Sequence, residues 1–517
     1  MTTGSSNVLY DALLGAARDP QKALIRRPAP AAGGDVISYG DMVALTGRLA
    51  NALVGLGVKP GDRVAVQVEK SAEALALYLA TVRAGGVFLP LNTAYTASEV
   101  SYFVGDAEPA LVVCSGASLD AVSVIAGKNG ARCETLEGDG TGSLMDLAAS
   151  QPEAFETVTR DNDDLAAILY TSGTTGRSKG AMLSHMNLLD NARVLVDTWR
   201  FTDADVLLHA LPIFHTHGLF VASNTVMLSG GTMIFLPKFD ADAIISLLPQ
   251  ATTMMGVPTF YTRLLARKDF NRDLVSHMRL FTSGSAPLLA ETHVEFEDRT
   301  GHRILERYGM TETNMSTSNP YDGERRAGTV GFPLPGVSLR IADPDTGAPI
   351  DTGKIGMIEV TGPNVFSGYW RMPEKTASEF RADGFFITGD LGQIDEDGYV
   401  HIVGRQKDLI ISGGFNIYPK EIELAIDELE GVNESAVIGV PHPDFGEGVV
   451  AVVVPLEGAK LSEDGVKAAI ADKLARFKQP KRVFFADALP RNTMGKVQKN
   501  LLRDDHGAEF SEPVTLS

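Results

Sequence analysis

The residues between 170 and 180 combine types that together bind an anion. Three glycines let backbone N–H groups approach a ligand, while five Ser or Thr hydroxyls and the cations of Arg177 and Lys179 add donors and charge. This combination predicts a loop that holds the phosphates of a nucleotide. A Walker A loop does not fit, because Gly176 is followed by Arg177 instead of a Lys and a hydroxyl residue. The simpler alternative is a polar surface turn, although such turns seldom carry two cations and five hydroxyls together.

Apolar runs on both sides indicate how this loop is held. Residues 165–169 read as a buried strand, and residues 181–183 read as a second strand before a helix that opens near Ser184. The loop is therefore predicted to be a hairpin-like turn.

Small or hydroxyl residues also follow three later predicted strands, within residues 252–263, 278–287 and 304–313. Each stretch alone could be an ordinary turn with a Ser or Thr helix cap. Because the carboxyl ends of parallel strands meet at one edge of a sheet, their succession predicts a ligand crevice at that edge.

The loop at 170–180 is similar, almost letter for letter, to the nucleotide loop of the adenylate-forming enzymes, which include acyl-CoA synthetases, peptide-synthetase adenylation domains and luciferases. The resemblance extends from about residue 8 to residue 505 and implies ATP and Mg²⁺ as ligands. It implies that these residues hold the β- and γ-phosphates of ATP: Thr171, Ser172, Gly173, Thr174, Thr175, Gly176 and Lys179.

The same resemblance assigns the rest of the nucleotide site. Four residues are expected to flank adenine: Ser285, Ala286, Tyr308 and Gly309. Thr311 is expected to contact the α-phosphate and Glu312 to hold Mg²⁺, which keeps most of its waters and takes one or two protein carboxylates. Asp390 is expected to hold the ribose hydroxyls, with Arg405 beside them.

Residues 490–499 resemble the loop that carries the catalytic lysine of this family, here Lys496, on an exposed turn. The implied chemistry has two steps: a carboxylate attacks the α-phosphorus of ATP to give an acyl-adenylate, and a thiol then attacks the acyl carbon. Lys407 is the implied hinge for the movement between the two steps. The implied lining of the coenzyme A tunnel is Ser412, Gly413 and Gly414.

The acid is predicted to be malonate, with methylmalonate as a second substrate. The segments 215–218 and 306–312 resemble malonyl-CoA synthetases more than acetyl or long-chain enzymes, and His215 is implied to border the acyl pocket. The predicted acid-binding residues are His215, Arg263, Ser285 and Arg307. Arginine binds carboxylates through two parallel hydrogen bonds, but Arg263 could instead cap a helix and Arg307 could pair with an acidic residue. A metal at His215 and His217 lacks a third nearby ligand.

Other functions remain open at this point. A short-chain monocarboxylate–CoA ligase, or a stand-alone adenylation enzyme that loads a carrier protein, would use the same nucleotide motifs. A luciferase-like oxygenase is possible from the fold, and a non-enzymatic nucleotide-binding protein would have no use for Lys496 and Glu312. Coenzyme A is the favoured thiol because no carrier module is attached.

Alternating helical and extended patterns predict an α/β protein with mostly parallel sheets covered by helices. We expect a large N-terminal domain over 1–404 that includes a small β unit at about 325–403. A hinge at 405–408 and a small mobile α+β domain at 409–517 are expected to follow.

Composition limits the partners. The formal charge of −19 argues against nucleic acid and anionic membranes, and no apolar run is long enough to span a bilayer. Cys114 and Cys133 have neither metal-ligand nor disulfide-scaffold spacing, and the first residues lack a signal pattern, so a cytoplasmic location is expected. Resemblance to bacterial family members makes Lys496 a candidate for a lysine acetyltransferase. The oligomeric state cannot be read from the sequence.

Overall fold

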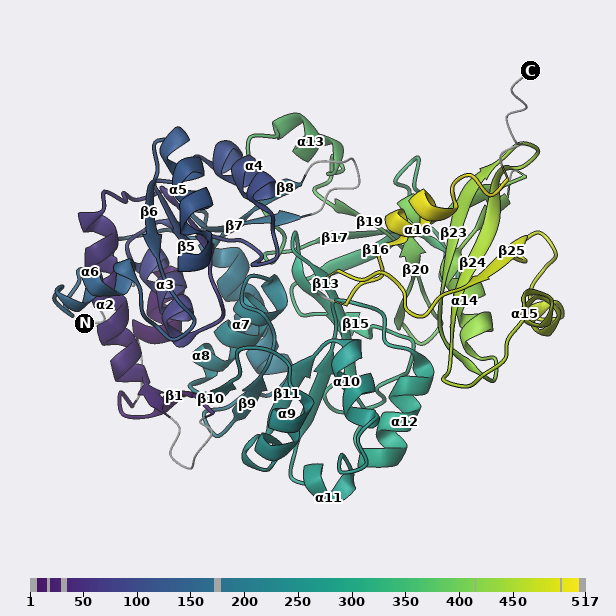
Figure 1. The fold of residues 1–517 in the computed structure, drawn as a ribbon, viewed down its shortest axis with the longest axis horizontal. Helices are drawn as coiled ribbons and strands as arrows, with labels where there is room; N and C mark the ends of the chain where they lie inside the picture. The colour runs from purple at the N-terminus through teal and green to yellow at the C-terminus, as the bar shows by residue number, and fades with distance from the viewer. Residues whose placement is uncertain are drawn as a thin grey trace. The chain divides into compact units, whose positions relative to one another are not determined.

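The computed structural model describes residues 7–15, 19–28, 35–171, 178–413, 415–492 and 495–510. The chain divides into two compact units: unit 1 is Met1–Leu339 with Val360–Phe386, and unit 2 is Arg340–Glu359 with Ile387–Ser517 (Figure 1). The predicted hinge at 405–408 concerns a movement between domains and stays a prediction.

Unit 1 contains a seven-stranded sheet in the order β18-β8-β7-β4-β3-β5-β6. Strands β3 to β7 pair in parallel, and β8 folds back on β7 as an antiparallel hairpin. The central strands are short apolar runs buried on both faces, as parallel strands covered by helices require. The bounds are β3 Arg63–Gln67, β4 Val87–Pro90, β5 Leu111–Cys114, β6 Arg132–Thr135, β7 Leu165–Thr171, β8 Lys179–Ser184 and β18 Gly368–Tyr369.

A second sheet of unit 1 has nine strands in the order β15-β14-β13-β12-β11-β9-β10-β1-β2. Strands β9 to β13 are parallel, so their carboxyl ends meet at one edge, as predicted for the ligand crevice. The bounds are β1 Ala23–Arg26, β2 Val36–Ser38, β9 Val206–His209, β10 Thr232–Phe235, β11 Thr253–Gly256, β12 Leu280–Ser283, β13 Leu305–Met310, β14 Asn314–Ser318 and β15 Phe332–Pro333.

The helices of unit 1 begin where the sequence offers caps. Ser38, Thr96 and Ser184 each accept a hydrogen bond from the third helical backbone N–H, and that third residue bonds back to the cap. The bounds are α1 Val8–Tyr10, α2 Tyr39–Gly55, α3 Ala72–Arg83, α4 Ala97–Ala107, α5 Leu119–Lys128, α6 Ser143–Ala149, α7 His185–Thr198, α8 Thr225–Ser229, α9 Ala241–Leu247, α10 Pro258–Leu265, α11 Arg272–Val275, α12 Ala290–Thr300 and α13 Pro373–Ser378. Shorter turns of other types are η1 Asp11–Gly15, η2 Gly116–Ser118, η3 His217–Asn224 and η4 Leu248–Gln250.

Unit 2 is built on two antiparallel-rich sheets. A four-stranded sheet, β16-β17-β19-β20, lies almost entirely in this unit, and a second sheet runs β22-β21-β24-β23 with β25 beside β24. The strand bounds are β16 Ser338–Ala342, β17 Gly356–Thr361, β19 Phe386–Ile394, β20 Val400–Arg405, β21 Ile410–Ser412, β22 Phe415–Ile417, β23 Val432–His442, β24 Gly446–Pro455 and β25 Arg482–Phe485. The helix bounds are η5 Gln406–Asp408, α14 Pro419–Asp427, α15 Glu463–Ile470 and α16 Lys499–His506.

Helix α15 ends at Ile470, where turns follow and the Gln479 side chain donates to the carbonyls of Ala471 and Leu474. One detail differs from the sequence predictions. The stretch 325–403 is not a single β unit, since β15 and β18 join the large sheets and α13 is helical. Within the part of the chain that the structure describes, no helix is both long and apolar enough to cross a bilayer.

Candidate active site

The phosphate-loop hairpin is defined by its two strands. Strand β7 ends at Thr171, β8 begins at Lys179, and these two residues pair across the hairpin, which confirms the predicted turn. The predicted phosphate ligands between them lie outside the described residues: Ser172, Gly173, Thr174, Thr175 and Gly176. Their roles stay predictions.

Lys179 is buried and already has an anionic partner. Its Nζ lies 3.0 Å from Glu379 Oε1 and 4.1 Å from the ring centre of Tyr369. Lys375 contacts the same Glu379 oxygen at 2.6 Å. Sequence reasoning missed Tyr369 and Glu379, because nothing local links them to a loop about 200 residues earlier.

Glu312 lies on the tight turn between β13 and β14. Gly309 permits this turn, since a Cβ there would lie 1.8 Å from the carbonyl oxygen of Asn314. The buried Glu312 accepts at Oε1 from Tyr369 Oη at 3.1 Å and from Thr171 Oγ1 at 3.4 Å. Thr171 and Glu312, predicted from separate motifs, therefore lie together, with Thr311 half-buried beside them. A single carboxylate at the phosphate loop fits Mg²⁺, which binds mainly waters and phosphate oxygens.

The four residues expected at adenine lie on neighbouring strand ends. Ser285 and Ala286 follow β12, while Tyr308 and Gly309 belong to β13, which pairs in parallel with β12. Ser285 has φ of 70°, a left-handed conformation that is strained for a residue other than glycine and clusters at functional sites. Contact with adenine itself stays a prediction.

Arg307 is a buried cation at the same strand ends. Only 3% of the residue is exposed, and its Nε and Nη2 have no hydrogen-bond partner among the described residues. Burial lowers the pKa of the guanidinium below its usual value. Gly284 makes room for it, because a Cβ there would lie 2.3 Å from Arg307 Nη1. The alternative that Arg307 pairs with an acidic residue gains no support from this geometry.

His217 adds a second polar group with an unused donor or acceptor. Its Nδ1 lies 3.2 Å from Ser285 Oγ, and its buried Nε2 has no partner among the described residues. Burial, followed by repulsion from Arg307, holds the pKa of His217 far below its ordinary value, so the ring is neutral. The π-helix η3 begins at His217, and π-helical turns are frequent at functional sites. The His-x-His pattern in the sequence pointed to His217 as well as His215, but only His215 was predicted to bind the acid.

Two more of the predicted acid-binding residues, His215 and Arg263, differ from Arg307 in their surroundings. His215 is half-buried, and its Nδ1 accepts from the backbone N–H of His217 at 3.2 Å. Arg263 is exposed on α10, with its guanidinium 5.7 Å from the ring centre of Phe239. Tyr261, two positions earlier, faces the core, so Arg263 lies on the opposite side of the helix. This position gives no support to a role of Arg263 in acid binding.

In unit 2, Asp390 and Arg405 face each other on paired strands. They are opposite residues of β19 and β20, and Arg405 Nε lies 2.6 Å from Asp390 Oδ1. Asp390 is buried while Arg405 is partly exposed. The predicted pair is therefore assembled by one hairpin, and its contact with ribose stays a prediction.

Lys496 lies on an exposed turn, as predicted. Arg491 and Val497 form a β-bridge, and the Asn492 side chain accepts from the Lys496 backbone N–H at 2.9 Å. Loss of water around the ammonium, followed by repulsion from Arg405, lowers the pKa of Lys496 to about 8, although part of the residue is accessible. Asp390, Lys407 and Asp408 also act on this amine. Four residues with separately predicted roles therefore share one electrostatic environment: Asp390, Arg405, Lys407 and Lys496.

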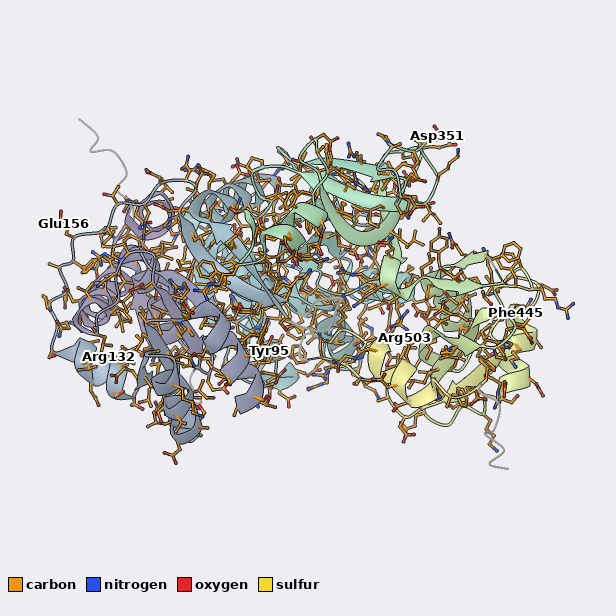
Figure 2. All side chains as sticks on the ribbon, turned by 90° about the horizontal axis from the view of Figure 1, so that it is seen from above. Tyr95, Arg132, Glu156, Asp351, Phe445 and Arg503 are labelled. Carbon is orange, nitrogen blue, oxygen red and sulfur yellow. The ribbon has the colours of Figure 1, made fainter. Side chains whose placement is uncertain are left out.

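The predicted coenzyme A loop follows β21, in the other sheet of unit 2. Ser412 is buried at the end of β21, Gly413 has φ of 58° and donates to the Phe445 carbonyl at 2.8 Å, and Gly414 lies outside the described residues. Arg503, which lies on α16 and is labelled in Figure 2, bonds Asp408 Oδ1 at 2.6 Å and so ties that helix to η5. The predicted hinge residue Lys407 is therefore flanked by an anchored neighbour.

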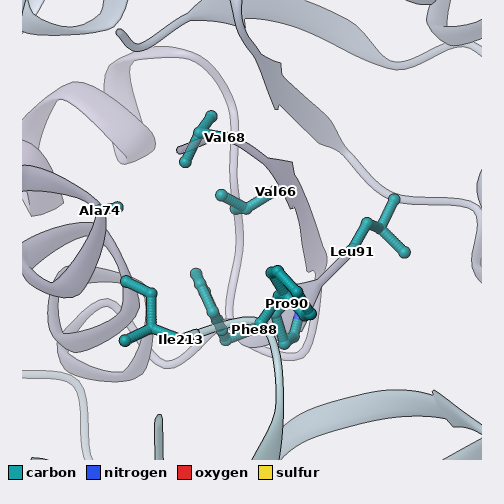
Figure 3. A pocket seen from close by; sticks show the side chains of 8 residues that line it. Val66, Val68, Ala74, Phe88, Pro90, Leu91 and Ile213 are labelled. Carbon is teal, nitrogen blue, oxygen red and sulfur yellow. The ribbon is translucent and has the colours of Figure 1, made fainter. Parts of the chain in front are cut away.

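A separate hollow in unit 1 is lined only by apolar side chains, among them Val66, Phe88 and Ile213 (Figure 3). It contains no charged or polar side chain and so offers nothing to orient a dicarboxylate. Elsewhere, the described residues contain no group of three or more His, Cys, Asp or Glu side chains that could hold a metal by themselves.

The fold and these motifs define an AMP-binding enzyme. The sequence model of the AMP-binding enzyme family matches residues 15–370, and the model of its C-terminal domain matches residues 421–496. The chain therefore belongs to this family, and its fold is the mixed α/β fold of the adenylate-forming enzymes.

Individual relatives refine this assignment. The crystal structure of ATP-bound MatB from Rhodopseudomonas palustris is 63% identical, covers 98% of this chain and 100% of that chain, and superposes with a TM-score of 0.96. A malonate–CoA ligase of Arabidopsis thaliana is 37% identical over 87% of this chain and 79% of its own length. A feruloyl-CoA synthase of an Amycolatopsis species is also 37% identical, over 92% of this chain and 95% of its own.

Proposed function

We propose that this protein joins malonate, and also methylmalonate, to coenzyme A through an acyl-adenylate, with release of pyrophosphate and then AMP. The observation that carries this proposal is the buried guanidinium of Arg307, two of whose nitrogens have no partner in the described part of the chain. The named activity of the malonate–CoA ligase from Arabidopsis thaliana supports it, as does the likeness to MatB.

The charge of the substrate explains why Arg307 matters. A buried cation without an anion is unfavourable, and a carboxylate that accepts two parallel hydrogen bonds removes that cost. Malonate has two carboxylates, so one can attack ATP while the other binds Arg307. The neutral ring of His217, whose Nε2 is unpartnered among the described residues, supplies a further group for the same acid. A monocarboxylate would leave the guanidinium unmatched.

The first step brings two anions together. The ammonium of Lys496 would neutralise charge on the transferred group, and Thr311 would contact the α-phosphate. A magnesium ion held by Glu312 and the phosphates would screen the remaining negative charge. In the second step, rotation about Lys407 would withdraw Lys496 and bring Ser412 and its neighbouring glycines to the pantetheine of coenzyme A.

Two further proposals concern the cell. A reducing compartment such as the cytoplasm is supported by Cys114 and Cys133, which are free although their sulfur atoms lie 3.9 Å apart. The accessible turn around Lys496 would suit a lysine acetyltransferase, and acetylation would remove the charge that the first step uses.

The test is substrate selectivity after removal of the Arg307 charge. Arg307→Leu should lower kcat/KM for malonate at least 100-fold, since loss of about 2.7 kcal/mol is two powers of ten. Activity with butyrate should fall little or rise. Measurements of kcat/KM with malonate, methylmalonate, succinate and butyrate decide the matter, with Arg303→Leu as the control for an exposed arginine nearby.

Two outcomes would contradict the proposal. A wild-type protein that prefers butyrate would be a short-chain monocarboxylate ligase. An equal fall in kcat/KM for all four acids in the Arg307→Leu variant would argue against recognition of a second carboxylate. Arg263→Leu should leave the selectivity unchanged because Arg263 is exposed. Pyrophosphate exchange without coenzyme A turnover would indicate a carrier-loading adenylation enzyme.

A further inference from the structure

The Tyr369 hydroxyl lies between two carboxylates. Its oxygen is 2.6 Å from Glu379 Oε2 and 3.1 Å from Glu312 Oε1, and the residue is 2% exposed. A phenol has one proton and can donate it fully to only one acceptor at a time. A phenol is protonated at neutral pH, so the Tyr369 hydroxyl is available as a donor.

The tyrosine is itself held in place from several sides. Its ring packs edge-on against Phe366 with centroids 4.8 Å apart, and Lys179 Nζ lies 4.1 Å from its ring centre. Glu379 is fixed by Lys179 at 3.0 Å and by Lys375 at 2.6 Å. The phenol oxygen therefore occupies one position relative to Glu312.

Both contacts from Tyr369 and Thr171 to Glu312 use Oε1. A carboxylate whose orientation is fixed by hydrogen bonds can coordinate a cation without first losing rotational freedom. Groups that orient a metal ligand in this way commonly change metal affinity by 10- to 100-fold when they are removed.

We propose that Tyr369 is a positioning residue that orients Glu312 for a divalent cation, with Glu379 fixing the tyrosine and connecting it to Lys179 of the phosphate loop. This inference rests on the proposed role of Glu312 in cation binding. It assigns a role in the nucleotide site to Tyr369 on β18 and to Glu379 after α13, two positions that lie outside the sequence motifs of that site. The same Glu379 contacts Lys179 and Tyr369, so the phosphate loop and the cation carboxylate share one hydrogen-bonded cluster.

The experiment measures cation binding instead of turnover. Mn²⁺ is titrated into the protein with saturating ATP and no acid, and unbound Mn²⁺ is followed by electron paramagnetic resonance. Tyr369→Phe retains the ring and its packing, so the fold should persist, but the dissociation constant for Mn²⁺ should rise at least tenfold. In a separate assay with malonate present, the Mg²⁺ concentration for half-maximal pyrophosphate exchange should rise by the same factor, while the rate at saturating Mg²⁺ stays within threefold of wild type.

Two controls separate orientation from general disturbance. Tyr39→Phe removes another buried phenol, which donates to the Gly231 carbonyl, and should leave Mn²⁺ binding unchanged. Glu379→Gln retains an acceptor oxygen for the phenol, so the Mn²⁺ constant should change less than threefold.

Unaltered Mn²⁺ affinity in Tyr369→Phe would overturn the assignment. A rise in the Mn²⁺ dissociation constant of Glu379→Gln as large as that of Tyr369→Phe would also overturn it. The charge of the cluster, and not the orientation of Glu312, would then determine the affinity for Mn²⁺. The Mn²⁺ titration contains no acid, so these outcomes are independent of whether malonate is the substrate.

Discussion

Two arginines beside neighbouring strands of the nine-stranded sheet have opposite surroundings. Arg279 immediately precedes β12 and holds Asp205 through two bonds, Nε to Oδ1 at 2.6 Å and Nη2 to Oδ2 at 2.8 Å. Arg307 lies on β13 at the carboxyl end of β12 and has two nitrogens without a partner among the described residues. One edge of the sheet therefore carries a matched ion pair, and the other carries an unmatched cation.

The contrast between the two arginines distinguishes a charge that stabilises the fold from a charge that is available to bind a ligand. Burial alone would raise the pKa of Asp205, but hydrogen bonds from Arg279 and Thr202 lower it, so the folded state stabilises this carboxylate. The stabilisation is present above the pKa of an unfolded aspartate and is lost as the pH falls through the lower folded pKa. For Arg307 the effect on stability is the opposite, because burial lowers the pKa of the guanidinium and so disfavours its charged form in the folded state.

The largest expected effect is a reversal in stability between the two arginines. Arg279→Leu leaves Asp205 buried without its cation and should lower the free energy of unfolding by about 3 to 5 kcal/mol. Arg307→Leu removes an unmatched charge and should leave this free energy unchanged or raise it. Urea unfolding followed by tryptophan fluorescence reports on unit 1, which contains Trp199 and Trp370. Equal destabilisation by both substitutions would remove the distinction.

A smaller effect is expected when the Arg307 guanidinium is moved while its charge is retained. Gly284→Ala places a methyl group against Arg307 in a packed site, at a cost of about 1 to 3 kcal/mol. We expect kcat/KM for malonate to fall by roughly 30-fold, about 2 kcal/mol, and kcat/KM for butyrate to change less than threefold. Gly127→Ala in α5 is the matched control, because a Cβ there would meet nothing within 4 Å. An identical loss with both acids would mean that Gly284 affects packing in general.

The smallest effect distinguishes a titrating cation from a permanent one. Lys496 loses its proton as the pH rises through about 8, so kcat/KM for adenylation should fall roughly tenfold between about pH 8 and 9. The kcat profile should fall at higher pH, because bound phosphates favour the ammonium form. In Lys496→Arg the charge persists over this range, so the alkaline fall should disappear even if the rate is lower. An unchanged profile in that variant would assign the fall to another group.

Much of the candidate site follows from short stretches of sequence. The β7–β8 hairpin, the helix that begins after Ser184 and the exposed turn at Lys496 were all predicted, because each depends on apolar periodicity, caps or glycines within about ten residues. Asp390 and Arg405 were assigned from two motifs, and a single hairpin makes them neighbours. Resemblance supplied the roles of these residues, which hydrophobic patterning alone could not distinguish.

What the sequence by itself determined is the family, the α/β architecture and the residues of its nucleotide motifs. Only the tertiary structure decided which of the polar residues are left without partners and which are neutralised. Lys179 is paired with Glu379, 200 positions away. Two nitrogens of Arg307 find no partner among the residues that the structure describes, although Glu306 precedes it in the chain. The reason is physical: periodicity and capping act within a few turns, whereas the partner of a buried charge depends on which strands and loops the packed sheets bring to it.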